Sequence, residues 1–141
     1  MAEPAQAAFA SLSRGDMLPP IDLVITADDV RAYLDATGES VARWQQYVPP
    51  LMLDALMLGI LLQQAELPSG LMHTGQEHES RRPARIGESL TIQFRVASNA
   101  VRSGAIFAVF EAEARAGDAV MATLRASVMA PKPAEEGEAS R

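Results

Sequence analysis

The fold is decided by one apolar stretch that follows a pair of prolines: PPLMLDALMLGILL, residues 49–62. Apart from Asp54 and Gly59, every residue after the prolines is apolar, so a helix built from it has almost no polar face. It is too short to cross a bilayer, which takes about 20 residues. We therefore expect a buried helix that is surrounded by protein and ends at the segment LPSG, residues 67–70, where proline and glycine favour a turn.

Downstream of this helix the apolar period changes to two. Leu90, Ile92, Phe94 and Val96 alternate with polar residues, as in a half-buried strand. Two further strands are predicted over 106–114 and 120–129, joined by a short loop at 116–118, and the segment 99–104 supplies the preceding turn.

Upstream, a short strand is predicted over 21–25 and an amphipathic helix follows it. Thr26 opens this helix with Asp29 as its capping-box partner, and Gly38 ends it. Val30, Tyr33 and Leu34 share its apolar face.

The order strand, helix, buried helix, then about four antiparallel strands predicts an α+β domain. The buried helix is covered most economically if the antiparallel sheet curls around it, which is the hot-dog fold, and the free sheet edge favours pairing into a double hot dog. We place this domain at 17–130, between a flexible N-terminal segment, 1–16, and a flexible C-terminal tail, 131–141.

Composition excludes several classes of function. The chain has 141 residues, a net charge of −6 and no cysteine, which argues against nucleic acid as a partner and against disulfides or thiolate metal sites. Its N-terminus lacks the basic and apolar regions of a signal peptide. We expect a cytoplasmic protein without membrane contact, metal or cofactor.

Three segments together resemble the MaoC-like hydratase/dehydratase family, most closely its amino-terminal, often non-catalytic domain type. They are Gly15 to Pro19 with the helix that follows, the start of the Pro49-Pro50 helix, and His73 to Glu77 leading into Arg82-Pro83 and Gly87-Glu88. The resemblance covers most of residues 14–130. It implies a substrate held as a thioester of CoA or acyl carrier protein, and reversible addition of water to a 2-enoyl thioester.

The resemblance also implies an acid–base dyad that this chain lacks. Catalytic members carry the pattern Gly-Asp-x-Asn-Pro-x-His, which falls here on Gly38 to Trp44 and puts Glu39 at the aspartate and Trp44 at the histidine. An indole nitrogen is only a donor and cannot take a proton from water. Backbone N–H groups at the start of the central helix are expected to stabilise charge on the thioester oxygen.

Three other side chains are candidates for catalysis or structure. Asp54 is interpreted either as a complement to the helix dipole or as the water-activating carboxylate of a thioesterase. His73 is either a hydrogen-bonded structural histidine or a polar group near a partner interface. His78, five residues later on a strand, is expected on the opposite face and at the surface, which argues against a shared metal.

The expected acyl-thioester site combines cations with apolar side chains. Arg81, Arg82 and Arg85 flank Pro83 and suit the phosphates of CoA or a phosphopantetheine arm, although a solvated turn explains them equally well. Residues assigned to substrate contact or to an acyl tunnel are Trp44, Pro50, Leu51, Met52, Leu56, Met57 and Leu71, and the apolar ones serve as core in the alternative reading.

The sequence predicts a pocket-forming subunit of an enoyl-thioester hydratase or 3-hydroxyacyl-thioester dehydratase, whose partner chain brings the Asp/His dyad. Three alternatives stay open. The first is a self-sufficient homodimeric hydratase that uses Glu39 or His73. The second is an acyl-CoA thioesterase that uses Asp54, and the third is a non-catalytic acyl-thioester-binding module.

Overall fold

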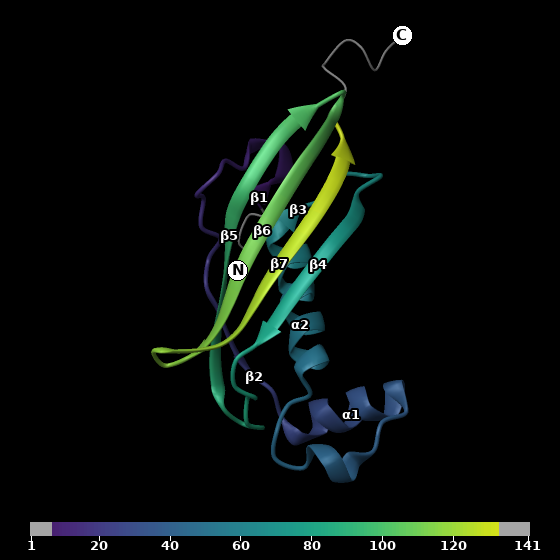
Figure 1. Ribbon diagram of the computed structural model, residues 1–141, viewed down its shortest axis with the longest axis vertical. Helices are drawn as coiled ribbons and strands as arrows, with labels where there is room; N and C mark the ends of the chain where they lie inside the picture. The colour runs from purple at the N-terminus through teal and green to yellow at the C-terminus, as the bar shows by residue number, and fades with distance from the viewer. Residues whose placement is uncertain (1–6, 133–141) are drawn as a thin grey trace, which may run out of the picture.

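The computed structural model describes residues 7–132 and consists of a curved sheet lying along a long helix (Figure 1). The sheet has five antiparallel strands in the order β2-β5-β6-β7-β4. Its strands are β2 (Ile21–Val24), β4 (Met72–Ser80), β5 (Ser89–Arg102), β6 (Ala105–Ala116) and β7 (Ala119–Pro131). The helices are α1 (Ala27–Thr37) and α2 (Pro50–Gln64), with short 3-10 turns at Phe9–Ser11 and Val41–Trp44. The predicted α+β architecture, a bent sheet against a central helix, is confirmed.

The core lies between the inner face of the sheet and α2. Alternate residues of β5, including Ile92, Phe94 and Val96, are buried, while their neighbours face outward, as the period of two predicts. The helix contributes Met57 and Leu61, both almost completely buried, to the same cluster.

Two tight hairpins join the long strands. The predicted turn at 99–104 is shorter than expected, because β5 continues to Arg102 and only Ser103 and Gly104 form the loop. Both loop residues have positive φ, 51° and 77°, which is the backbone of a type I′ turn and matches the twist of the flanking strands. Gly117 and Asp118 form the second loop, within the range predicted for it.

The first helix has the termini that its sequence predicts. Thr26 accepts a hydrogen bond from the Asp29 N–H, and the Asp29 carboxylate accepts one from the Thr26 N–H, which completes the capping box. Gly38 caps the other end with φ at 74°. Val30 and Leu34 are buried and Tyr33 is half-buried, so α1 packs through its apolar face.

The central helix ends earlier than predicted. It begins at Pro50 but stops at Gln64, because Ala65 and Glu66 leave it in extended conformation as β3 and pair in parallel with β1 (Ala7–Ala8). The segment 67–70 is therefore part of the connection to β4 and not the helix stop.

Residues 7–132 cover only part of α2, whereas the sequence predicted a helix enclosed on all sides. Leu51 and Leu62 are 66% and 46% exposed, Ala55 is exposed and Leu58 is half-buried. These four residues, spaced by four, three and four positions, form one face of the helix, which we call the α2 stripe. Over residues 7–132 the structure holds no helix long and apolar enough to cross a bilayer.

The packed part of the chain begins before residue 17, where the domain was predicted to start. Phe9 and Leu12 are buried, and the Asn99 side chain donates to both of their carbonyl oxygens, at 3.2 and 2.7 Å. The remaining residues of the predicted flexible ends, 1–6 and 133–141, lie outside the part that the structure describes.

Candidate functional site

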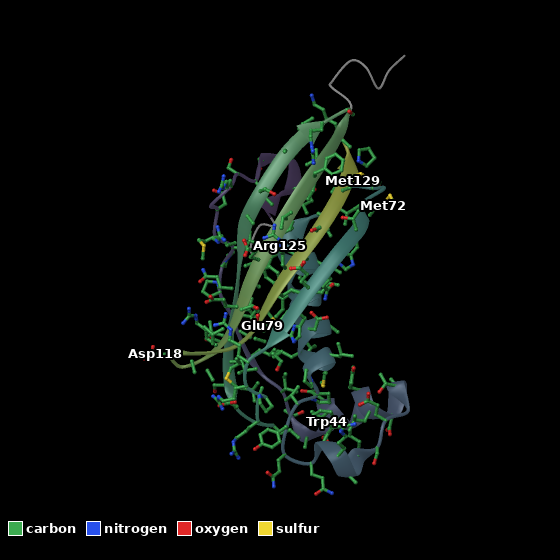
Figure 2. All side chains as sticks on the ribbon, viewed as in Figure 1. Trp44, Met72, Glu79, Asp118, Arg125 and Met129 are labelled. Carbon is green, nitrogen blue, oxygen red and sulfur yellow. The ribbon has the colours of Figure 1, made fainter. Side chains whose placement is uncertain are left out.

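Glu39 and Trp44, the positions that the family pattern was expected to fall on, lie at the α1 end of the molecule (Figure 2). Glu39 is exposed directly after the Gly38 cap, and Trp44 is half-buried at the end of a 3-10 turn. The Arg43 guanidinium lies 5.5 Å from the centre of the Trp44 ring, a cation–π contact. Trp44 is seen low in Figure 2, at the opposite end of the molecule from Met72 and Met129.

His73 is not close to these residues, because it follows Met72 at the far end of β4 (Figure 2). A β-bulge at Thr74 adds one residue to the strand, so that His73 is opposite Val128 and His78 is opposite Leu124. Both partners face the core, so the two histidines share the inner side of the strand. The prediction that His73 and His78 lie on opposite faces of the strand is therefore wrong, because the bulge shifts the alternation of side chains by one residue.

The structure brings Asp54 together with two residues of β4. The Gln76 side-chain amide donates to Asp54 Oδ2 at 2.6 Å, and His78 Nδ1 lies 3.2 Å from Asp54 Oδ1. The His78 and Asp54 side chains are only 12% and 16% exposed. The 3.2 Å contact is close enough for an ion pair but lacks hydrogen-bond alignment, so Asp54 Oδ1 and both ring nitrogens of His78 are buried without a hydrogen-bond partner among residues 7–132.

This cluster, Asp54 with Gln76 and His78, changes two of the predictions. His78 is not a surface residue, because its side chain is turned inward against α2. Asp54 is the fifth residue of α2 and lies beyond the first turn, where the helix dipole acts most strongly. Gln76 was missed, although its spacing of two from His78 places both side chains on one face of a strand.

The start of α2 is tied to the turn that carries the arginines. The Val48 N–H donates to Ala84 O at 2.8 Å and the Ile86 N–H donates to Gln46 O at 2.9 Å. The Arg85 guanidinium lies 5.4 Å from the centre of the Tyr47 ring, and Arg82 lies 3.5 Å from Glu88. These contacts hold Arg82 and Arg85 beside the N-terminal end of α2.

The start of α2 has fewer free backbone N–H donors than the sequence predicted. Pro49 and Pro50 have no N–H, and the N–H groups of Met52 and Leu53 both donate to Pro49 O, at 3.0 and 3.3 Å. The helix start therefore offers a thioester oxygen few unpaired donors.

The apolar residues assigned to an acyl tunnel divide into two groups. Met52 and Met57 are buried in the core, whereas Leu51 is exposed on the α2 stripe. Pro50, Leu56 and Leu71 are half-buried between these extremes. Only the exposed and half-buried members are available to a ligand without repacking the core.

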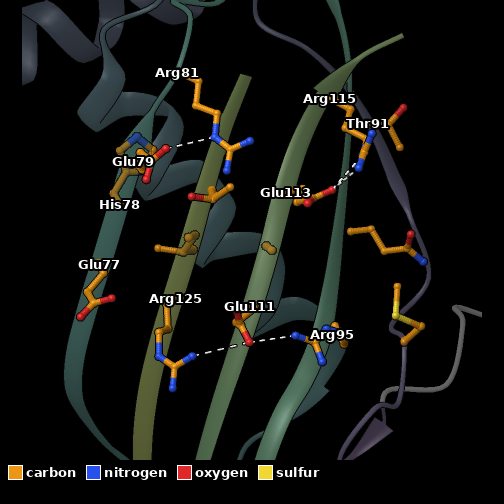
Figure 3. A pocket seen from close by; sticks show the side chains of 15 residues that line it. Glu77, His78, Glu79, Arg81, Thr91, Arg95, Glu111, Glu113, Arg115 and Arg125 are labelled. Atoms are coloured by element: carbon orange, nitrogen blue, oxygen red, sulfur yellow. Dashed lines mark hydrogen bonds and ion pairs between the residues drawn. The ribbon is translucent and has the colours of Figure 1, made fainter. Parts of the chain in front are cut away.

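A hollow of about 680 Å³ lies on the outer face of the sheet, away from α2 (Figure 3). Its arginines are already paired with carboxylates: Arg81 with Glu79, Arg95 and Arg125 with Glu111, and Arg115 with Glu113. Four glutamates and four arginines line it, so the charges balance and leave no cation for a phosphate. We therefore place the candidate site at the Asp54 cluster.

The described residues contain no group of three or more acidic, histidine or cysteine side chains suited to a metal.

Comparison with known proteins relates this chain to solved structures only. No protein-family model matches it, and no curated protein matches it. The (R)-hydratase of A. caviae involved in PHA biosynthesis superposes with a TM-score of 0.69 at 21% identity, covering 87% of this chain and 98% of its own. A MaoC-like dehydratase from Rhodospirillum rubrum superposes with a TM-score of 0.70 at 15% identity, covering 87% and 95%.

A third structure is a complex. The C-terminally truncated HadBC complex of Mycobacterium tuberculosis, a 3R-hydroxyacyl-ACP dehydratase, superposes with a TM-score of 0.64 at 14% identity, covering 86% of this chain and 99% of the matched chain. At sequence identities of 14–21%, this similarity establishes the fold and does not establish the reaction. The chain has the hot-dog fold.

Proposed function

We propose that this chain is the pocket-forming subunit of an enoyl-thioester hydratase or 3-hydroxyacyl-thioester dehydratase and works with a second hot-dog chain. The observation that carries the proposal is the open flank of the domain, by which we mean the α2 stripe together with β4. Among residues 7–132, strand β4 ends the sheet and pairs only with β7, so one row of its backbone groups has no neighbouring strand there.

A second hot-dog chain fits this flank in two ways. Its edge strand can continue the sheet beyond β4, and its central helix can cover the apolar side chains of Leu51, Leu58 and Leu62. The HadBC complex, a 3R-hydroxyacyl-ACP dehydratase, supports a two-chain arrangement for this fold.

The acyl thioester would lie along the open flank, beside the start of α2. Arg82 and Arg85 are held next to that start and are both exposed, which suits the phosphates of CoA or of a carrier-protein arm. Among residues 7–132, no carboxylate lies within ion-pair distance of Arg85, whereas Arg82 is paired with Glu88. The Arg85 guanidinium is therefore the more available of the two to bind a phosphate. Trp44 and the half-buried Leu56 are proposed to contact the rest of the ligand, whereas Leu71 precedes Met72 at the other end of the molecule (Figure 2).

The standard dyad would come from the second chain. Hydration needs a base for the attacking water and donors for the thioester oxygen. Glu39 is exposed and has no histidine beside it, because Trp44 takes that position. A self-sufficient enzyme built on Glu39 therefore has little structural support.

The test uses crotonyl-CoA with the chain alone and with a hot-dog chain that carries the Gly-Asp-x-Asn-Pro-x-His pattern, ideally one encoded next to it. Hydration by the mixture is expected to exceed clearly the sum of the separate rates. Release of free thiol instead would favour the thioesterase alternative, in which Asp54 activates water against the thioester carbonyl. If several dyad-bearing chains neither form a complex with this chain nor change its rate, the proposal fails.

Trp44 offers a direct measure of binding, because it is the only tryptophan in the chain. If it contacts the ligand, its fluorescence changes with increasing acyl-CoA and saturates. Arg85→Ala is expected to weaken that binding about tenfold, and salt to weaken it further, because phosphate contacts are electrostatic. Arg125→Ala, on the outer face of the sheet, is the matched control and should leave the titration unchanged.

A further inference from the structure

The Asp54 cluster has a feature that packing alone does not explain. Three of its polar atoms, Asp54 Oδ1 and the two ring nitrogens of His78, are shielded from solvent and have no hydrogen-bond partner within the described chain. Burying such atoms unpaired is costly, and native proteins keep few of them without a reason. The contact that does exist, between Gln76 and Asp54 Oδ2, fixes the carboxylate but leaves its second oxygen turned toward His78.

The cluster lies at the border of the open flank. Asp54 is three residues after Leu51 and four before Leu58 on α2, so it is adjacent to the α2 stripe on the helix surface. Gln76 and His78 belong to the edge strand β4. His78 is also four residues before Arg82 in the chain. Figure 3 shows His78 on β4 beside Glu79 and Arg81.

The geometry also assigns different tasks to the two nitrogens of His78. Nδ1 faces the Asp54 carboxylate at 3.2 Å, so a proton on this nitrogen would point toward the carboxylate. Nε2 then keeps a free lone pair, which is the property of a general base. A carboxylate beside Nδ1 favours the tautomer that leaves the lone pair on Nε2.

We infer that His78, positioned by Asp54 and Gln76, is an acid–base residue of this chain that acts on a 2-enoyl or 3-hydroxyacyl thioester at the open flank. The inference rests on the proposed function for its substrate, but it gives the chain a catalytic group that a purely pocket-forming subunit lacks. Asp54 and His78 are other positions of the sequence than Glu39 and Trp44, which the family pattern singles out.

The step balances without a further reactant. In hydration, His78 Nε2 takes a proton from water while the water oxygen bonds to C3 of the enoyl thioester. The C2=C3 π electrons move toward C2 and the thioester oxygen. The imidazolium then returns its proton to C2, which leaves the 3-hydroxyacyl thioester and neutral His78. Dehydration is the same sequence in reverse.

The experiment measures crotonyl-CoA hydration by the full chain alone, where no standard dyad is present. We expect turnover above the uncatalysed rate. His78→Gln should lower kcat about 100-fold, within the usual range for a general base, and Asp54→Asn should lower it at least about tenfold with little change in KM. Glu77→Gln, on the same strand and facing outward, is the matched control and should retain the wild-type rate.

A spectroscopic readout separates positioning from mere folding. The chain has only two histidines, so a His73→Gln background leaves His78 as the single imidazole. Nitrogen-15 NMR of that protein is expected to show the proton on Nδ1, and adding Asp54→Asn is expected to shift the population toward the Nε2 tautomer. Circular dichroism of each variant checks that it is folded, and an unfolded Asp54→Asn is replaced by Asp54→Glu, which should recover part of the rate.

Each outcome bears on one proposal. If the chain alone is inactive while the two-chain mixture hydrates crotonyl-CoA, the inference about His78 is overturned and the proposed function stands. A chain that is active alone and keeps its rate in His78→Gln also overturns the inference, and loss of that rate in Glu39→Ala would assign the base to Glu39. If neither the chain nor any mixture hydrates the substrate, the proposed function fails.

Discussion

Gln76 is the residue that holds Asp54 in place, since its amide donates to Oδ2 at 2.6 Å. Gln76→Leu removes this donor and leaves a largely buried carboxylate oxygen unpaired. We expect it to lower the free energy of unfolding by about 1–3 kcal/mol, measured by urea denaturation. Gln45→Leu, at an exposed position, is the control and should change stability by much less; an equal effect of the two would mean that the bond contributes nothing.

The sequence predicted the residue types of the site better than their partners. Asp54 was a candidate from its place on the apolar helix, but its contacts are 22 and 24 positions away on β4. The bulge at Thr74 has no clear sequence signal, and it decides which side chains of the strand face α2. For the same reason His78 was expected at the surface, and Glu39, chosen by alignment to a family pattern, proved to be exposed.

At the scale of elements, the capping box of α1 makes a prediction about pH. Hydrogen bonding by the Thr26 backbone N–H, and secondly by the Thr26 side chain, lowers the pKa of Asp29 below its ordinary value of 3.8. The folded state therefore binds this proton more weakly than the unfolded state, so the stabilisation is present above that value and is lost as pH falls through the lowered pKa.

The corresponding experiment compares melting temperatures across pH. Asp29→Ala should lower Tm at neutral pH, and its difference from the wild type should shrink as the pH falls below 3.8. Asp28→Ala removes the neighbouring exposed carboxylate without breaking a capping bond and should have a smaller effect. A Tm difference for Asp29→Ala that is independent of pH would contradict the assignment.

Local signals account for the elements that the sequence placed correctly. Thr26, Asp29 and Gly38 determine the ends of α1 through contacts within a few residues, and the period of two determines the inner face of β5. The end of α2 was misplaced because it depends on pairing between β1 and β3, which are far apart in the sequence. A propensity-based reading cannot detect that pairing.

At the scale of the whole molecule, stability depends on the cluster between the sheet and α2. Phe110 is completely buried there and lies 6.5 Å, centre to centre, from the ring of Phe9. Phe110→Ala is expected to cost about 3–5 kcal/mol in the free energy of unfolding. Phe107→Ala, on the outer side of the sheet beneath Arg102, is the control, and a cost equal to that of Phe110→Ala would mean that the core is misplaced.

The open flank predicts how the chain assembles. Leu62→Glu places a charge on the α2 stripe and should weaken association with a second hot-dog chain, as measured by analytical ultracentrifugation. Val101→Glu introduces the same charge at a position of similar exposure, 55%, near the tip of a hairpin, and should leave association unchanged. Equal association of both variants would show that the stripe is not an interface.

The most direct test of the account is the rate at which this chain, mixed in equal amounts with a dyad-bearing hot-dog chain, hydrates crotonyl-CoA, compared with the same mixture made with Leu62→Glu. We predict that the wild-type mixture exceeds the sum of the separate rates and that Leu62→Glu returns it to that sum. A wild-type mixture that shows no gain, or a gain that Leu62→Glu leaves intact, would contradict the claim that the open flank completes an acyl-thioester hydratase.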